Sequence, residues 1–123
     1  MKRVILVLVL VLCAPRTFAQ DSITRFFVSF AFETLSIGTV SSTFTRATIE
    51  PTGRDYRANM IEFSIEGCPI RYRIGATAPT ATVGVLMLEG NGKMFGWDNI
   101  RDIKFIRDTS CTANATLSTQ IYR

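Results

Sequence analysis

Apolar and polar residues alternate along much of this chain with a period of two residues. The clearest case is MIEFSIE at 60–66, in which Ile61, Phe63 and Ile65 alternate with polar side chains. Side chains of a β-strand point alternately to the two faces of a sheet, so this pattern predicts a strand with one buried face. No long segment shows the spacing of an amphipathic helix. The chain is therefore predicted to be all-β.

Further strands are predicted on both sides of this segment, separated by turn-forming stretches at 51–59 and 75–82. At 89–93, EGNGK predicts a hairpin turn, because Asn91 and Gly92 readily adopt the positive φ of tight turns. A total of about seven to nine short strands is typical of a single antiparallel β-sandwich, of jelly-roll or immunoglobulin-like type. The other predicted strands are RFFVSFAFETLSI at 25–37, with Phe26, Val28, Phe30 and Phe32 on one face, TVSSTFTRATIE at 39–50, IRYRI at 70–74, with Ile70, Tyr72 and Ile74 on one face, VGVLMLE at 83–89, KMFGW at 93–97, IRDIKFIR at 100–107 and ATLSTQIY at 115–122.

The first twenty residues, MKRVILVLVLVLCAPRTFAQ, have the organisation of a secretory signal. A positively charged start precedes an apolar run over 4–14, and Pro15 ends this run just before the small-x-small pattern TFA. We therefore expect residues 1–19 to be a cleaved signal peptide. One alternative is a membrane anchor, but the run is shorter than the roughly 20 apolar residues of a spanning helix. The other is a lipoprotein modified at Cys13, where the preceding Leu12 is too bulky.

Removal of this segment changes the charge that matters for function. The whole chain has 14 basic and 10 acidic residues, but Lys2, Arg3 and Arg16 lie in the leader, so residues 20–123 are nearly neutral. Nucleic-acid binding calls for a concentrated basic surface, so no nucleic-acid partner is expected. Residues 20–123 fit one β-sandwich domain. We expect a secreted or periplasmic protein with no membrane span once the signal is removed.

Two cysteines, Cys68 and Cys111, remain after residue 19. In an oxidising compartment this number predicts one disulfide, with two free thiols as the alternative. A metal site is not expected, because the chain has no histidine and structural zinc usually takes four nitrogen or sulfur ligands. No cofactor is expected either.

Four stretches of the chain resemble a group of small phage-encoded β proteins. They are VSSTF at 40–44, EGCPIRYRIGATAPTATVG at 66–84, IRDIKFIR at 100–107 and ATLSTQIY at 115–122. Proteins of that group typically carry an APIRYR core followed by PTATVG, then an isoleucine-rich strand and a terminal ATL-V-Y. The resemblance covers residues 38–123. It implies a compact β-sandwich of the kind found among virion structural proteins, with no catalytic residues to carry over.

The chain departs from that group in features connected with export. Cys68 stands where the group usually has alanine, Cys111 lies in a loop that normally lacks cysteine, and the group generally has no signal peptide. The two cysteines and the leader support one another, because disulfides persist in oxidising compartments. The expectation is an exported, disulfide-linked relative that is virion-associated if the resemblance holds.

Two groups of residues are candidates for ligand or partner contact. Arg71 and Arg73 share one face of the predicted strand 70–74, either as a solvated face with salt bridges to residues such as Glu62 or Glu66, or as a contact patch for a partner subunit or an acidic glycan.

The second group is Trp97, Asp98 and Asn99, in FGWDN at 95–99. The indole ring could stack on a sugar while the other two side chains bind hydroxyls. The alternative is that Trp97 closes one end of the core beside Phe95.

Catalysis is not expected. Without histidine the chain lacks the commonest general base. Asp98 and Asp102 form a possible acid pair, but any chain with ten acidic residues offers such pairs.

We expect a non-enzymatic structural or binding sandwich, most like a phage-type virion surface module, with a protein partner or self-assembly and a possible glycan. One alternative is a secreted carbohydrate-binding or adhesion module. Another is a subunit of an extracellular assembly whose Phe-rich segment 26–32 pairs with a neighbour's sheet edge instead of forming an internal strand.

Overall fold

The computed structural model describes residues 27–123, which form seven strands and two one-turn helices. This confirms the all-β expectation, whereas the predicted signal peptide lies outside the described residues. Over 27–123, no helix is long and apolar enough to cross a membrane. The elements are β1 (Ser29–Ile37), α1 (Arg46–Ile49), β2 (Met60–Glu66), β3 (Ile70–Ile74), β4 (Val85–Met87), β5 (Gly92–Gly96), α2 (Trp97–Ile100), β6 (Ile103–Arg107) and β7 (Ala115–Tyr122).

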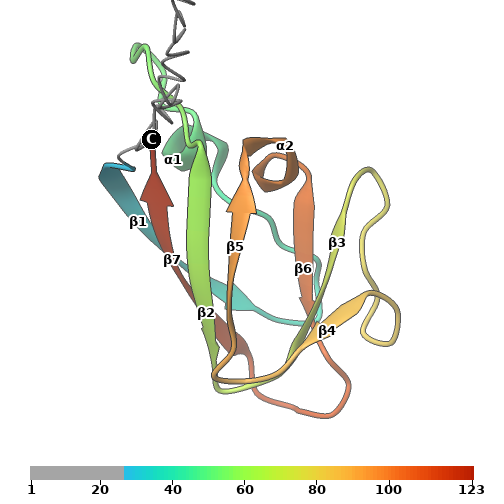
Figure 1. Cartoon of the computed structure of the whole chain (residues 1–123). Coiled ribbons are helices and arrows are strands. Elements are labelled where there is room, and N and C mark those ends of the chain that lie inside the picture. The colour runs from blue at the N-terminus through green and yellow to red at the C-terminus, as the bar shows by residue number, and fades with distance from the viewer. Residues whose placement is uncertain (1–26) are drawn as a thin grey trace, which may run out of the picture.

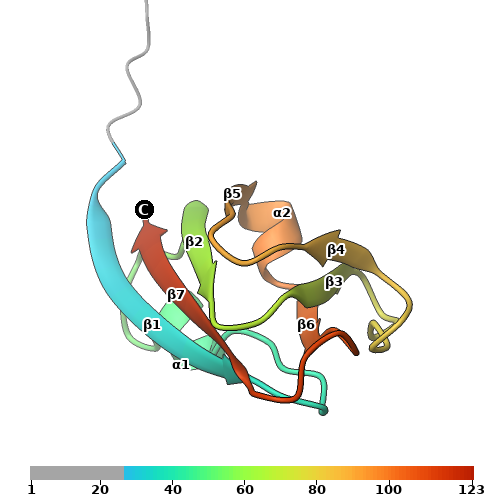
Figure 2. The ribbon, with the colours of Figure 1, turned by 90° about the horizontal axis from the view of Figure 1, so that it is seen from below.

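The strands form two antiparallel sheets, one of four strands in the order β1-β7-β2-β5 and one of three in the order β4-β3-β6. Figures 1 and 2 show the two sheets facing each other, with both helices at the end of the sandwich where β7 finishes. In an immunoglobulin domain the first strand pairs with the second, so the strand order here is not that of an immunoglobulin domain. β2 and β3 belong to different sheets, and residues 67–69 cross between them.

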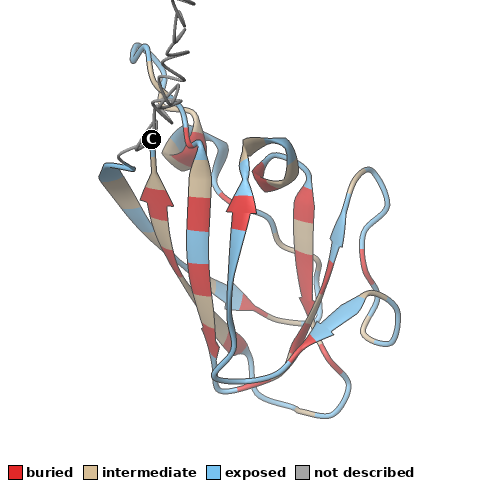
Figure 3. Ribbon diagram, viewed as in Figure 1, coloured by how far each residue is buried: buried red, intermediate tan, exposed pale blue. Residues whose placement is uncertain are grey.

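The core is built on β2, which pairs with β7 on one side and β5 on the other. Its alternation is as predicted, with Ile61, Phe63 and Ile65 buried and the residues between them half-buried or exposed (Figure 3). The ring of Phe63 lies 5.6 Å from that of Phe95 in the same sheet and 5.5 Å from that of Phe105 in the other sheet. This aromatic cluster therefore joins the two sheets.

β1 differs from its prediction because its register with β7 shifts between Ser29 and Ala31. A bulge of this kind moves all later side chains to the opposite face. Phe30 therefore packs against the core, while Phe32 points outward with 61% of its surface exposed. The prediction that these phenylalanines share a face is wrong for Phe32, and Phe26 lies outside the described residues. β1 pairs with β7 of its own chain and forms one edge of the four-stranded sheet, so residues 29–32 belong to an edge strand.

The predicted strand at 39–50 is wrong. The chain leaves β1 in one sheet and crosses to the outer edge of β6 in the other, where Ser42 exchanges two backbone hydrogen bonds of 2.8 Å with Phe105. Phe44 then turns into the core, 5.3 Å from the ring of Phe105, and α1 follows. The Thr- and Ser-rich composition favours a strand locally, but bridging the two sheets requires a crossing segment instead.

The predicted hairpin at 89–93 is also wrong, because β4 and β5 lie in different sheets. The residue with positive φ is Gly90, at 79°, while Asn91 and Gly92 do not have positive φ. The predicted strand at 93–97 is displaced by one residue to β5, and the one at 100–107 begins only at Ile103, since α2 occupies Trp97–Ile100 between them.

The predicted disulfide joins Cys68 and Cys111, whose Cα atoms are 6.0 Å apart across a separation of 43 residues. This Cα distance is within the usual range for disulfides. Cys68 is fully buried in the crossing between β2 and β3, and Cys111 lies in the loop between β6 and β7. The bond therefore links two connections that each cross between the sheets. Figure 1 shows both connections at the end of the sandwich opposite to the helices.

Candidate functional site

The outer face of the four-stranded sheet carries side chains in rows that run across the strands. One row contains Phe32 of β1, Gln120 of β7, Glu62 of β2 and Met94 of β5, because these residues are paired in register. In the adjacent row toward the helices, Met60 lies between Tyr122 and Gly96; on the other side, Ser64 lies between Ser118 and Gly92. The face is thus polar at its centre and apolar toward the helices.

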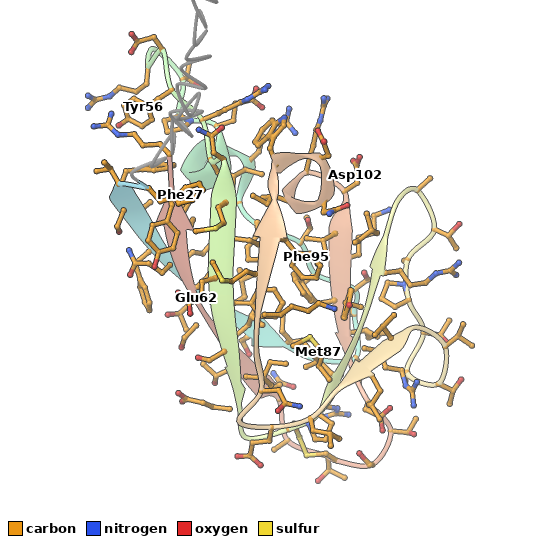
Figure 4. All side chains as sticks on the ribbon, in the orientation of Figure 1. Phe27, Tyr56, Glu62, Met87, Phe95 and Asp102 are labelled. Carbon is orange, nitrogen blue, oxygen red and sulfur yellow. A yellow bond between two sulfur atoms is a disulfide. The ribbon has the colours of Figure 1, made fainter. Side chains whose placement is uncertain are left out.

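A hollow of about 690 Å³ lies at the helix end of this face, and we name it the Met–Trp hollow. β2 and β5 contribute Met60 and Met94, and Trp97 begins α2 directly after β5. Figure 4 shows Phe27 near the helix end of this sheet and Glu62 further along it. The hollow is lined by Phe27, Asn59, Met60, Met94, Phe95, Gly96, Trp97 and Arg123.

Gly96 keeps the Met–Trp hollow open. It follows Met94 on the outward face of β5, where any side chain would project into this space. Its backbone is extended, and an added Cβ would meet only the carbonyl oxygen of Asn59, at 4.0 Å. Larger residues are therefore compatible with the backbone here, so the hollow can be filled by substitution without distorting the strand.

Cationic side chains flank the apolar lining. The guanidinium of Arg57 lies 4.4 Å from the centre of the Trp97 ring, and that of Arg123 lies 4.5 Å from the centre of the Tyr56 ring. Such cation–π contacts fix the orientation of both partners. The backbone N–H of Trp97 also donates to the carbonyl of Asn59 at 3.0 Å. The Trp97 ring is thus held in place, and the hollow has a positive rim.

A second, smaller depression of about 250 Å³ lies beside the Met–Trp hollow, and we name it the polar trough. Its Glu62 carboxylate accepts a hydrogen bond of 3.2 Å from the Tyr122 hydroxyl. Burial and then this carboxylate raise the pKa of Tyr122. The trough is lined by Phe32, Glu62, Phe63, Ser64, Gly92, Ser118 and Gln120.

Arg71 holds a loop in place and does not lie on a solvated face. Its Nε lies 2.5 Å from the carboxylate of Asp108, and the guanidinium donates to the carbonyls of Ala81 and Gly84 at 3.2 Å. The predicted partners Glu62 and Glu66 are wrong, because they belong to the other sheet.

The carboxylate of Asp108 also accepts a hydrogen bond from the backbone N–H of Ser110. The pKa of Asp108 is lowered, first by the backbone N–H of Ser110 and also by Arg71. Arg71 and Asp108 therefore tie the loop between β3 and β4 to the end of β6.

The remaining predicted contact residues are not brought together. Arg73 is exposed, and so is Ile74, which was expected to face inward. β4 pairs with β3 only as far as Tyr72, so Ile74 lies beyond the covered part of the strand. Asp98 is exposed on α2 and does not line the hollow; nor does the half-buried Asn99. Of the predicted sugar-binding group, only Trp97 lines the Met–Trp hollow.

Sequence reasoning missed Phe27, Met60, Met94 and Arg123. A signal was available for one of them, because the alternation of β2 places Met60 on the same face as Glu62. Among residues 27–123, no cluster of three or more histidine, cysteine or acidic side chains could hold a metal ion.

Comparison with known proteins adds no relative to this picture. No family model, curated protein or solved structure matches the chain.

Proposed function

We propose that this chain is an exported, non-enzymatic binding module, most like a phage-type virion surface module, and that the Met–Trp hollow receives an apolar anchor from a partner protein. One observation carries the proposal. Two methionines, Phe27 and Trp97 border an open hollow on an outward sheet face. Protein interfaces are enriched in aromatic residues, methionine and arginine, and their affinity concentrates where an apolar side chain fills a pocket.

The dimensions and chemistry of the hollow suit such an anchor. A volume of about 690 Å³ is within the range of specific ligand sites. Methionine side chains adapt to anchors of different shape, so Met60 and Met94 provide an adjustable floor. The guanidinium groups of Arg57 and Arg123 stand close by. They favour a partner segment with an acidic residue beside its apolar anchor.

The disulfide supports export, and the lack of histidine favours binding over catalysis. A disulfide that closes a separation of 43 residues stabilises a domain outside the reducing cytoplasm. The chain also has no histidine, so a Ser-His-Asp or Cys-His arrangement cannot be built.

The test uses the fact that Trp97 is the single tryptophan of the chain. N-acetyl-L-phenylalaninamide, as a stand-in for an aromatic anchor, should change Trp97 fluorescence in a saturable manner. A binding free energy of about 0.3 kcal/mol for each of the roughly 15 heavy atoms of this probe corresponds to a Kd on the order of 1 mM. Gly96→Val should weaken this binding at least about tenfold by filling the hollow. Phe32→Ala, which removes an exposed ring from the same sheet face, is the matched control and should bind as wild type.

The proposal is wrong if the wild-type protein shows no saturable response at about 10 mM probe, ten times the Kd expected. Equal binding by wild type and Gly96→Val would also place the probe elsewhere. Circular dichroism and thermal melting of each variant establish that the sandwich is intact.

The polar trough favours a second candidate function, a carbohydrate-binding module. The exposed ring of Phe32 stands beside the carboxylate of Glu62 and the amide of Gln120, and sugars combine an apolar ring face with hydroxyls that such groups bind. On a glycan array, a ligand held here should be lost with Phe32→Ala and kept with Gly96→Val. This is the opposite of the pattern expected for the Met–Trp hollow, and an array without any bound glycan would exclude this candidate.

A further inference from the structure

The two sheets have four edges, and three of them carry features that oppose pairing with another chain. Along β6, Ser42 pairs with Phe105 and the carbonyl of Gly38 accepts from the backbone N–H of Arg107 at 2.9 Å. β1 has its register shift at one end, and β5 carries Lys93 and begins and ends with glycine. Bulges, lysines and covering segments are the usual protection of sheet edges.

Within residues 27–123, the fourth edge, β4, has no bulge, lysine or covering segment, although the strand is short at three residues. No charged residue occurs from 77 to 88, and the strand itself reads Val-Leu-Met. Val83, Val85, Leu86 and Leu88 each expose 45–54% of their surface. An exposed apolar edge of this kind is suited to pairing with another strand.

The register shows which backbone groups of β4 are free. Phe105 points its N–H and C=O toward Ser42, away from β3. In an antiparallel sheet, successive residues of a strand direct their backbone hydrogen bonds to opposite neighbouring strands. Tyr72 lies opposite Phe105 and therefore does not bond to β6, so Ile70 and Tyr72 bond to β4, whereas Arg71 bonds to β6. Val85 and Met87 are the residues opposite them. The N–H and C=O of Leu86 therefore point outward, and within residues 27–123 they have no backbone partner.

We propose that a second copy of this chain pairs along the open edge of β4. The two β4 strands run antiparallel, with Leu86 of each copy opposite Leu86 of the other, on a twofold axis. Each Leu86 N–H then donates to the C=O of the other Leu86. The three-stranded sheets of the two copies join as one six-stranded sheet.

This arrangement is complementary to itself, as a twofold interface requires. With Leu86 on the axis, Val85 of one copy lies opposite Met87 of the second copy, and Val83 lies opposite Glu89. No like charges meet, because Glu89 is the first charged residue after β4. An unrelated strand could use the same hydrogen bonds, but the uncharged edge and its symmetric apolar sequence favour the chain itself.

Self-association through β4 goes beyond the proposed binding function and is compatible with it. The Met–Trp hollow lies on the other sheet, so a dimer would carry two free hollows. Two linked sites bind a partner with repeated anchors more tightly than one site does, without a new contact. A dimer could form even if the hollow binds nothing, so the two proposals fail independently.

The experiment measures mass in solution by sedimentation equilibrium at protein concentrations up to about 1 mM. The exported protein should reach twice the monomer mass. Leu86→Lys should remain a monomer, because it places two like charges against each other on the axis. Val40→Lys is the matched control, since Val40 is 77% exposed away from β4, and it should dimerise like wild type. A wild-type protein that stays monomeric would overturn the proposal, as would a folded Leu86→Lys that dimerises.

A second variant covers the case in which Leu86→Lys fails to fold. Directly opposite Cα atoms in a hydrogen-bonded antiparallel pair lie about 5.5 Å apart, which fits a disulfide. Leu86→Cys should therefore crosslink two copies at least about tenfold faster under mild oxidation than Val40→Cys, as read from non-reducing gels. Equal crosslinking rates would contradict the edge pairing.

Discussion

Replacing both bonded cysteines with alanine should leave the sandwich folded but much less stable. The bond between Cys68 and Cys111 closes 43 residues, for which the chain-entropy model gives a stabilisation of about 4 kcal/mol. Cys68 is fully buried and Cys111 packs against the core, so loss of the two sulfur atoms adds to this figure. Typical domains are stable by about 5–15 kcal/mol, so the variant keeps only part of its stability.

Urea unfolding followed by Trp97 fluorescence and circular dichroism measures the change. For a domain of about 100 residues, each kcal/mol corresponds to about 4–8 °C, so the double variant should melt roughly 15–30 °C below wild type. Wild type with its disulfide reduced should behave in the same way, because the linkage itself provides most of the effect. Thr112→Ala, an exposed substitution in the same loop, is the control and should unfold within about 0.5 kcal/mol of wild type.

A difference of less than about 1 kcal/mol between wild type and the double variant would refute the entropy argument. Labelling of two thiols in the oxidised, denatured exported protein would refute the disulfide itself.

Three further perturbations test separate parts of the structure. The pKa of Asp108 is lowered mainly by the backbone N–H of Ser110. The ionised carboxylate therefore stabilises the fold at pH values above about 3.9, the pKa of the group in the unfolded chain. This stabilisation is lost as the pH falls through the lower pKa of the folded state. Urea unfolding from about pH 6 to pH 2 should therefore show a weaker acid dependence for Asp108→Asn than for wild type, and identical pH profiles would contradict this. Gly84→Ala should cost about 1–3 kcal/mol in the same assay at neutral pH, because φ is +138° and the added Cβ would lie 3.0 Å from a carbonyl oxygen of β3; an unchanged midpoint would contradict the strain. Phe63→Ala should cost about 3–5 kcal/mol by leaving a cavity between the sheets, whereas the exposed Phe32→Ala should cost less than about 0.5 kcal/mol, and equal losses would contradict the assigned core.

The parts of the fold that the sequence predicts well are strands with one buried face. β2 and β7 pack one side against the opposite sheet and leave the other outward, so their residues alternate without interruption. The bond between Cys68 and Cys111 was also predictable, since only two cysteines follow the apolar run over 4–14. Both inferences depend on short-range pattern or on counting, and neither requires knowledge of the topology.

The incorrect predictions are those that depend on which sheet a segment joins. Neither residues 39–50 nor residues 89–93 show in their composition that the chain changes sheet there. The shift between Ser29 and Ala31 moved Phe32 to the outer face. Its mark in the sequence is indirect, because the apolar residues change from even-numbered to odd-numbered positions only at Leu35 and Ile37.

The candidate site was only partly predictable for the same reason. Trp97 could be singled out because it is a lone tryptophan beside a predicted turn. Its neighbours in the Met–Trp hollow come from positions 27, 59–60, 94–96 and 123. Of these, 59–60 and 94–96 are adjacent only through the register of β2 with β5. Likewise, the pair of Arg71 with Asp108 joins residues 37 positions apart and requires the order of the three-stranded sheet.

The methyl groups of the methionines give the most direct test of the Met–Trp hollow. Met60 and Met94 line it, whereas Met87 is buried in the other sheet and serves as an internal control. In a protein labelled with ¹³C at its methionine methyls, titration with N-acetyl-L-phenylalaninamide should shift the Met60 and Met94 signals along one saturable curve. The Met87 signal should not move. If the signals of Met60, Met87 and Met94 shift together, or if none of them shifts at about 10 mM probe, the proposed binding site is wrong.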